Sequence, residues 1–345
     1  MRFSNFLFPE SKTPDGDFEV IEESLKEAEL TEALGYEVIW LAEHHFDGGC
    51  AYVDPITFAS AIAARTNKIK IGFAVAQMAL HHPTRFAEQI ALVDNISRGR
   101  MIVGVGRGTA YNFYEFRGFG IDPSDAHEML LEVEDVLVKA WTTENYKHQG
   151  KYWQLEMPSL RPQVYQKPHP PIIRACSGLE STLDMARQGR PFLMNLQSDD
   201  TTRQRVELYR STMAEGGYGE EAIAQNLAES WVWRNIFVAD TDAEAESVGV
   251  PYFRAMRAYL SENRTRMNTV EELDAQASAV AGPARDSLEH GLIYGSPDTV
   301  SERLHQLYDI GVGGVIIHFR LGAMPYDAAA HSLRLFAEKV APAFR

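Results

Sequence analysis

The stretch VIWLAEHHFDGG, residues 38–49, joins an apolar run to a cluster of ionisable side chains. Its first five residues are apolar without interruption, which is typical of a short strand that is covered on both faces. Glu43, His44 and His45 follow this run directly, and two glycines close the stretch. The sequence therefore predicts a buried strand that leads straight into groups able to exchange protons.

Seven other short apolar runs resemble this one, and stretches of helical periodicity separate most of them along the chain. Continuous apolar strands of this kind belong to parallel sheets whose faces are covered by helices. The predicted strands are residues 2–8, 37–42, 69–76, 100–106, 172–175, 191–196, 230–239 and 314–320. The predicted helices are residues 18–35, 55–67, 84–97, 126–141, 179–189, 201–217, 242–260, 296–311 and 326–342.

Eight parallel strands, each followed by a helix, predict a (β/α)8 TIM barrel that forms one domain over residues 1–345. A doubly wound sheet is the alternative, but it usually has about five to seven strands and carries a G-x-G-x-x-G motif after the first one. The sequence has no such motif there. We expect two inserted loops on the carboxyl-end face. Residues 145–171 read as a hairpin and loop, and residues 262–289, which are weakly apolar, read as a mobile loop.

The composition limits the possible partners and compartment. A formal net charge of -15 and the lack of any Lys/Arg run argue against binding to nucleic acid or to an anionic membrane surface. No apolar run approaches the ~18 residues of a membrane span, and the N-terminus does not read as a signal peptide. Cys50 and Cys176 are too few for a disulfide framework or a four-thiolate metal site. We therefore expect a cytoplasmic protein.

In a (β/α)8 barrel the loops after the strands meet at one mouth, and chemistry takes place there. The polar side chains expected at this mouth are Glu43, His44, His45, Gln77, His81, His82, Arg107, Asn112 and Ser177. Two adjacent histidines beside a glutamate favour a functional site, although one histidine before Pro83 could simply cap or pack a helix. No H-x-H or H-E-x-x-H spacing occurs, so we expect no metal.

A second group of residues suggests a phosphate site. Ser177, Gly178 and Ser181 lie at the start of a predicted helix, where free N–H groups and the helix dipole attract anions. Ser177 could instead serve only as an N-cap. Arg107, in the segment GVGRG, offers a cation beside backbone that a ligand can approach closely, or alternatively a surface salt bridge.

Several longer segments carry a resemblance to a known family. They include GYEVIWLAEHHF, IKIGFAVAQMALHHPTRFAEQIALVDNISRGRMIVGVGRG, FRGFG and GSPDTVSERL. Together they resemble the bacterial luciferase-like, flavin-dependent monooxygenases, in particular the luciferase alpha subunit. The resemblance implies a (β/α)8 barrel that binds reduced FMN and uses O2 to oxidise a small organic substrate such as an aldehyde or ketone. It also implies a separate NAD(P)H:flavin reductase and a homodimer, for which the helix at residues 86–96 is a candidate interface.

The resemblance also implies roles for single residues. His44 matches the catalytic histidine near the flavin, and we expect Glu43 to line the pocket and to orient or charge-tune His44. The residues expected to bind the cofactor are Ala74, Val75, Arg107, Ala175, Ser177, Gly178 and Ser181. Within this set, Ala74 and Val75 match a non-prolyl cis peptide beside the isoalloxazine, and Arg107 and Ser177 match positions near the phosphate.

The chain departs from the luciferase pattern in two places. Gly106 stands where the family has a reactive cysteine, and Cys176 stands where it has a glutamate, so we do not expect light emission. Water must be excluded from the flavin site, and the residues expected to wall it are Phe6, Trp40, Phe113, Met194 and Phe319. The alternatives are a deazaflavin-dependent oxidoreductase of the same superfamily, a non-catalytic flavin-binding protein and a metal-dependent hydrolase barrel.

Overall fold

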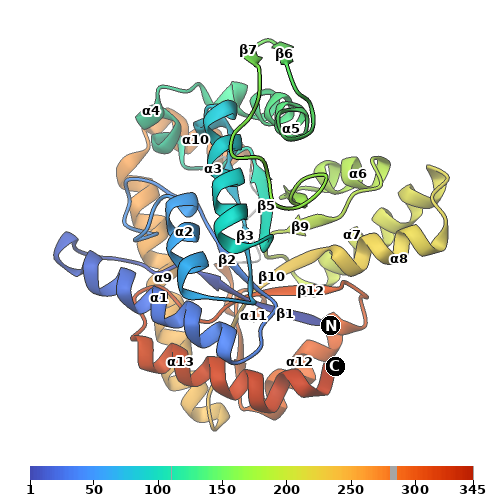
Figure 1. Cartoon of the computed structure of the whole chain (residues 1–345). Helices are drawn as coiled ribbons and strands as arrows, with labels where there is room; N and C mark the ends of the chain where they lie inside the picture. Colours follow the sequence, from blue (N-terminus) through green and yellow to red (C-terminus); the bar gives the residue numbers. More distant parts are fainter. Residues whose placement is uncertain (110, 280–285, 345) are drawn as a thin grey trace.

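Eight parallel strands form a closed barrel, which confirms the predicted fold class (Figure 1). The computed structural model describes residues 1–109, 111–279 and 286–344. The barrel strands are β1 (Arg2–Leu7), β2 (Val38–Leu41), β3 (Lys70–Phe73), β5 (Met101–Gly106), β8 (Ile172–Cys176), β9 (Phe192–Met194), β10 (Trp231–Val238) and β12 (Gly314–His318). They pair in the order β12, β1, β2, β3, β5, β8, β9, β10, and β10 pairs again with β12. The doubly wound alternative is excluded because that sheet would stay open.

Helices surround the barrel in the expected alternation. They are α1 (Asp17–Ala33), α2 (Pro55–Arg65), α3 (Pro83–Ser97), α5 (Ala126–Thr142), α6 (Leu179–Arg187), α7 (Asp199–Glu215), α12 (Pro297–Tyr308) and α13 (Tyr326–Leu335). Local sequence sets their ends. The Asp54 carboxylate accepts hydrogen bonds from the N–H groups of Ile56 and Thr57 at the start of α2, while Gly35, with φ +78°, follows the end of α1.

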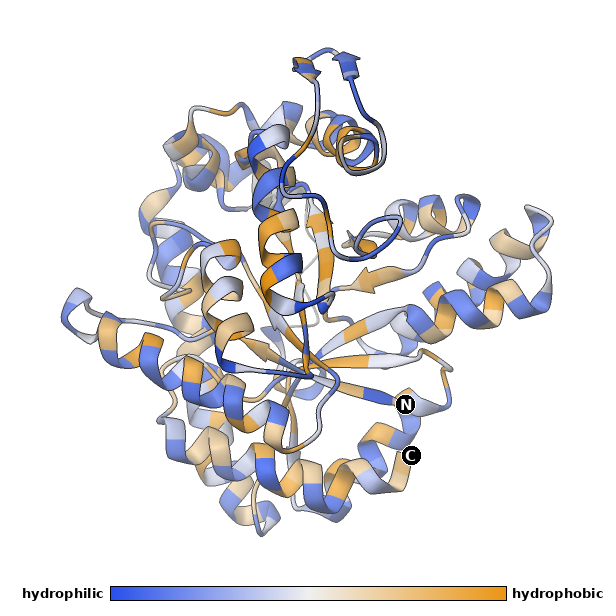
Figure 2. Cartoon of the chain, in the orientation of Figure 1, coloured by the Kyte–Doolittle hydropathy of each residue, from blue (hydrophilic) through white to orange (hydrophobic). Residues whose placement is uncertain are grey.

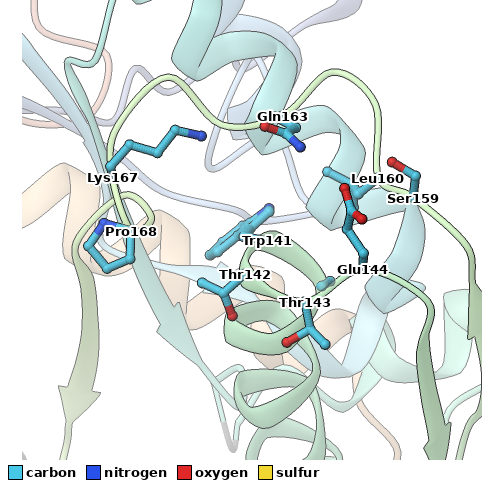
Figure 3. A pocket seen from close by; sticks show the side chains of 10 residues that line it. Trp141, Thr142, Thr143, Glu144, Ser159, Leu160, Gln163, Lys167 and Pro168 are labelled. Carbon is cyan, nitrogen blue, oxygen red and sulfur yellow. The ribbon is translucent and has the colours of Figure 1, made fainter.

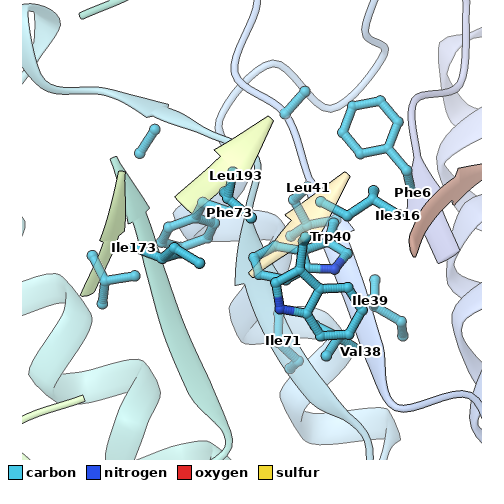
Figure 4. Packing of buried hydrophobic residues seen from close by; sticks show 14 of the residues in the cluster. Phe6, Val38, Ile39, Trp40, Leu41, Ile71, Phe73, Ile173, Leu193 and Ile316 are labelled. Carbon is cyan, nitrogen blue, oxygen red and sulfur yellow. The ribbon is translucent and has the colours of Figure 1, made fainter. Parts of the chain in front are cut away.

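The core lies inside the barrel and between the strands and helices, where apolar residues collect (Figures 2 and 4). Trp40 of β2 is fully buried, and its indole N–H donates to the Ser4 hydroxyl over 2.9 Å. A Cβ at Gly72, on the neighbouring β3, would lie 2.4 Å from the Trp40 ring. Glycine at this position is therefore what allows the indole to lie against the strand.

A break in the strand after β3 shapes the carboxyl-end face. β3 stops at Phe73, the Ala74–Val75 peptide is cis as expected, and β4 (Ala76–Gln77) then resumes pairing with β5. A Cβ at Gly104 would lie 1.6 Å from the Phe73 carbonyl oxygen, so β5 can approach this break only with glycine at that position. The chain thereby brings Gln77 to the edge of the mouth.

Additional elements cover the barrel between its strands and helices. The hairpin predicted in residues 145–171 is present as β6 (Tyr146–Gln149) and β7 (Gln154–Met157). The sequence did not indicate α4 (Phe113–Phe119), α8 (Glu220–Glu229) or β11 (Ile293–Gly295), which adds to the end of β10. None of the helices described is long and apolar enough to cross a membrane.

The prediction that residues 262–289 form a mobile loop is wrong for most of the segment. α9 (Asp242–Met267) runs into it, and α10 (Val270–Ala279) and α11 (Leu288–Gly291) follow, while residues 280–285 lie outside the described part. Polar side chains hold the end of α9: Asn263 bonds to the loop after β2, and Asn268, the C-cap of α9, bonds to the loop after β5. Apolar burial alone does not predict these helices, because the segment buries few apolar side chains.

Candidate active site

Loops after β2, β4 and β5 bring two buried carboxylates and three histidines together at the carboxyl-end mouth. Glu115, on α4, bonds the ring of His44, while Glu43 bonds the rings of His45 and His81. Both carboxylates are almost fully buried. A buried carboxylate needs partners to remain ionised, and the histidines and N–H groups here supply them.

Glu115 and His44 form a carboxylate–imidazole pair. The Glu115 Oε1 atom lies 2.9 Å from His44 Nδ1 and also accepts the His45 backbone N–H at 3.1 Å. Because an ionised carboxylate only accepts hydrogen bonds, Nδ1 carries the proton that it shares with Glu115. The Nε2 atom of neutral His44 is then the nitrogen that can take up a proton.

Each member of this pair shifts the pKa of the other. Burial alone would lower the pKa of His44, but the charge and hydrogen bond of Glu115 outweigh burial and raise this pKa above its usual value. Burial likewise raises the pKa of Glu115, but the charge of His44 and hydrogen bonds from its neighbours outweigh it, so the pKa is lowered. The pair is thus poised to stay charged toward neutral pH.

Glu43 does not hold the position expected of it beside His44. Its oxygens lie 3.2 Å from His45 Nε2 and 2.9 Å from His81 Nε2, and it accepts the Gln77 backbone N–H at 2.5 Å. Burial would raise its pKa, but the His81 charge and these hydrogen bonds lower it to about 2. The carboxylate that contacts His44 is instead Glu115, which the sequence analysis missed. Its only signal was an acidic residue in the apolar run NFYEF.

The loop that carries His44 and His45 is fastened to α4 and α9. The Tyr114 hydroxyl donates to Asp47 Oδ2 at 2.7 Å, and the Asp47 carbonyl accepts from Tyr259 Oη at 2.9 Å and from Asn263 Nδ2 at 2.8 Å. Arg264 Nε donates to Asn112 Oδ1 at 3.2 Å. α9 therefore helps to fix the loop beside which His44 lies.

Aromatic rings line the barrel interior beside His44. The Phe8 ring lies 5.4 Å from the His44 ring and 6.0 Å from that of His318, with Phe6 and Trp233 packed against His318 as well. Burial lowers the pKa of His318 to about 4. Its Nε2 and the Trp233 Nε1 are buried and without a hydrogen-bond partner among the described residues. Neither residue is among those that the sequence pattern places at the mouth.

Not every aromatic residue expected to wall the site does so. Phe319 packs between Tyr36 and Phe336, on the side of the strand that faces the helices. Trp40 lies against Ser4 and Trp231 in the core. Phe6, by contrast, belongs to the ring cluster around His318.

The residues expected near a phosphate lie at the ends of β5 and β8. Val105 pairs with Arg174, so the residues that follow, Arg107 and Ser177, leave adjacent strands of the barrel. Arg107 and Ser177 are exposed. Arg205 of α7, which the sequence analysis missed, donates from Nη1 to the Ser177 carbonyl at 3.3 Å.

The N-terminus of α6 is open to a ligand. Gly178, and not Ser177, is its N-cap, and the Ser181 hydroxyl lies 3.2 Å from Gly178 N and 2.9 Å from Gly178 O. A Cβ at Gly178 would meet no atom within 4 Å. Between this end and the cis peptide lies Gly106, where a Cβ would stand 2.5 Å from Val75 Cγ2 and 3.7 Å from Ala175 Cβ.

These features fit a cofactor that carries a phosphate. The open helix N-terminus and the cations of Arg107 and Arg205 suit the phosphate. Gly106 lets Val75 of the cis peptide lie against β5 beside Ala175. A cavity of about 370 Å³ lies elsewhere, between the end of α5 and residues 159–168, and no residue of the mouth lines it (Figure 3). No three His, Cys, Asp or Glu side chains of the described residues are placed to hold a metal ion.

Comparison with known proteins identifies the family of this chain. Residues 1–314 match the family of luciferase-like monooxygenases. Limonene 1,2-monooxygenase of Rhodococcus erythropolis is 25% identical over 99% of this chain and 86% of its own length. The oxygenase component of flavin-dependent trigonelline monooxygenase from Acinetobacter baylyi is 24% identical over 100% of this chain and 96% of its own.

Solved structures share the fold over the whole chain. The monooxygenase RslO1 of Streptomyces bottropensis superposes with a TM-score of 0.83 at 27% identity and covers 100% of both chains. The oxygenating constituent of 3,6-diketocamphane monooxygenase of Pseudomonas putida, in complex with FMN, gives 0.78 at 21% identity over 99% and 98%. The coenzyme F420 dependent tetrahydromethanopterin reductase of Methanopyrus kandleri gives 0.71 at 19% over 100% and 99%. By its match over residues 1–314, this chain belongs to the luciferase-like monooxygenase family and is a flavin-dependent monooxygenase.

Proposed function

We propose that the protein uses reduced FMN and O2 to oxidise a small organic substrate such as an aldehyde or ketone. Reduced FMN would supply two electrons, so that one oxygen atom enters the substrate and the other leaves as water. The observation that carries the proposal is the His44–Glu115 pair, 2.9 Å apart, at the barrel mouth. His44 Nε2 would hold or pass a proton during oxygen transfer.

The cofactor would be held from its phosphate end. Arg107 and Arg205 would bind the phosphate together with the Ser177 N–H, beside Gly178 at the start of α6, while the Gly178 N–H donates to the Ser181 hydroxyl. Ala74, Val75 and Ala175 would lie along the ring system. Phe6, Phe8 and Trp233 would keep water away, which matters because reduced flavin otherwise passes its electrons to oxygen without oxidising the substrate.

Supply of the reduced flavin would come from a separate NAD(P)H:flavin reductase. The sequence has no dinucleotide fingerprint after its first strand, and the trigonelline relative is named as an oxygenase component. The alternative of a deazaflavin cofactor is supported by the fold that this chain shares with the F420 dependent reductase. Titration with FMN and with F420, read by fluorescence, separates the two: our proposal expects tight binding of FMN, and tighter binding of F420 would favour the alternative.

Turnover by a His44 variant tests the catalytic assignment. With photoreduced FMN, O2 and a panel of aldehydes and ketones, we expect His44→Ala to bind FMN normally but to lose product formation by about 100-fold, with oxygen released as hydrogen peroxide. His331→Ala is the matched control, because His331 is exposed on α13 and bonds Asp240. Full product formation by His44→Ala would refute the assignment.

We also propose a homodimer that forms through α3. Phe86, Ala87 and Ile90 are fully buried against the protein's own barrel, whereas Leu92 and Ile96 are 51% and 43% exposed. Changing both exposed residues to Asp should convert a dimer to a monomer in sedimentation, while Phe18→Asp, at an exposed position of α1, should not. A wild-type protein that sediments as a monomer at micromolar concentration would contradict the proposal.

A further inference from the structure

Gln77 links the two carboxylates of the mouth. It is 2% exposed and lies two residues beyond the cis peptide. Its Nε2 atom donates to the Glu43 carbonyl at 2.8 Å and to Glu115 Oε2 at 2.9 Å. Its backbone N–H donates to the Glu43 carboxylate. Gln77 thus bonds both Glu43 and Glu115, the two residues whose carboxylates contact the histidines.

The orientation of the Gln77 amide follows from its partners. A carbonyl and a carboxylate oxygen can only accept, so the NH2 group must face them, and both of its hydrogens are used. The Oε1 atom consequently points toward Gly108, where a Cβ would stand 2.4 Å away, and it has no hydrogen-bond partner among the described residues. A buried acceptor left unpaired is unfavourable, by about 1–3 kcal/mol, so the placement of the two donors outweighs this cost.

The contact with Glu115 determines how that carboxylate is held. Glu115 Oε1 faces His44, the His45 N–H and Asn112, all from one side. Gln77 is the hydrogen-bond donor to the other oxygen, Oε2. Two bonded oxygens fix the plane of the carboxylate, whereas one bonded oxygen leaves it free to turn about its last torsion.

We propose that Gln77 is a positioning residue that holds Glu115 in the plane and charge state in which Glu115 orients His44 for proton transfer. The inference rests on the proposed function of His44. Gln77 touches neither the reacting atoms nor His44 itself, and it acts through Glu115. The loss of Gln77 should therefore lower kcat with little change in the Kd for FMN.

The expected effect on His44 has a definite sign. A hydrogen bond from Gln77 disperses part of the Glu115 charge, so removal of this donor leaves a stronger negative charge beside the imidazole. Gln77→Met should then raise the pKa of His44, by about half a unit. The other charged groups that act on His44 are Asp47, which raises this pKa, and Arg264, which lowers it, and the variant leaves both in place.

A double-mutant cycle read by NMR tests the inference. The imidazole pKa of His44, identified by its loss in His44→Ala, is measured in wild type, Gln77→Met, Glu115→Gln and the double variant. We expect Gln77→Met to shift the pKa upward in the wild type and to have no effect once Glu115 is a glutamine. An equal shift in both backgrounds, or no shift in either, would overturn the proposal.

Two further measurements distinguish the proposal from a general loosening of the mouth and allow for a Gln77→Met variant that does not fold. His81→Asn disturbs Glu43 and leaves Glu115 intact, so the His44 pKa should remain as in wild type; a shift like that of Gln77→Met would assign the effect to general loosening and overturn the proposal. If Gln77→Met does not fold, the side-chain amide of Gln77 in labelled wild-type protein should titrate with the same midpoint as His44. An amide resonance that does not move through that pH range would overturn the proposal.

The two proposals fail in different ways. If the NMR cycle behaves as expected but His44→Ala still forms product at the full rate, the proposed role of His44 is wrong and the positioning by Gln77 stands as a structural fact. If His44→Ala is inactive but the cycle shows no coupling, the proposed function stands and Gln77 is not a positioning residue.

Discussion

At the scale of the residue, the pairing of His44 with Glu115 sets how the site responds to pH. Because the pKa of His44 is raised, its neutral form appears only at a higher pH than in a free histidine. Glu115→Gln removes the negative partner, whose charge and hydrogen bond raise the pKa of His44, and should therefore lower this pKa. The pH at which kcat reaches half its maximum should move down by the same amount. A profile of kcat against pH that coincides with wild type would contradict the pairing.

Glu43 gives a prediction about how stability depends on pH, because its pKa is lowered whereas that of His44 is raised. Its folded-state pKa of about 2 lies below the ordinary glutamate value of 4.5, so its contribution to stability is present above pH 4.5 and is lost as the pH falls through about 2. Glu43→Gln should lower the free energy of unfolding at pH 7 by roughly 3 kcal/mol and flatten its decline in acid. Urea unfolding at several pH values measures both, with exposed Glu156→Gln as the control. Unchanged acid dependence would show that Glu43 is not the group responsible.

The sequence pointed to most single residues of the mouth but not to their pairing. Glu43, His44 and Gln77 were placed there because each follows a strand end, which is a property of the local pattern. That Glu115 and not Glu43 bonds His44 depends on how α4 folds back over the loop, and no spacing in the sequence encodes it. The unpartnered atoms of His318 and Trp233 likewise follow from packing across the barrel.

At the scale of the element, we propose that the start of α6 and Arg107 bind the phosphate of the cofactor. FMN carries a phosphate and riboflavin does not. Comparing the affinities of the two ligands therefore isolates the contribution of the phosphate site from that of the ring site. Arg107→Ala should weaken FMN binding about tenfold, or roughly 1.4 kcal/mol, and leave riboflavin binding unchanged. Arg187→Ala, at the opposite end of α6, is the control and should leave both ligands unaffected. Equal loss for both ligands would place Arg107 away from the phosphate.

The barrel elements and the hairpin of β6 and β7 could be predicted from the sequence, whereas α8 and α10 could not, because little apolar surface is buried there. Strands such as β2 and β5 are continuous apolar runs between helices of clear periodicity, so the sequence predicts that they are buried. α10 is held by polar contacts instead: Arg117 of α4 bonds Glu272, and Thr269 accepts at its start. Residues 220–229 bury only Ile223 and Leu227, too weak a pattern to reveal α8.

At the scale of the whole molecule, the barrel closes between strands from the two ends of the chain. β1 pairs with β12, and the Met1 ammonium donates to the Phe344 carbonyl at 2.8 Å, so the termini lie side by side (Figure 1). We propose that residues 1–345 behave as one folding unit. Circular dichroism and tryptophan fluorescence should then report the same single unfolding transition. Two separated transitions would indicate independent units.

The central claim is that this chain transfers one atom of O2 to an organic substrate with reduced FMN. The direct test is to mix the protein with photoreduced FMN and 18O2 in the presence of the aldehyde and ketone panel, and to weigh the products by mass spectrometry. The account predicts a product that carries one 18O atom and appears with wild type but not with His44→Ala. Consumption of oxygen entirely as hydrogen peroxide, with no labelled product from any member of the panel, would contradict it.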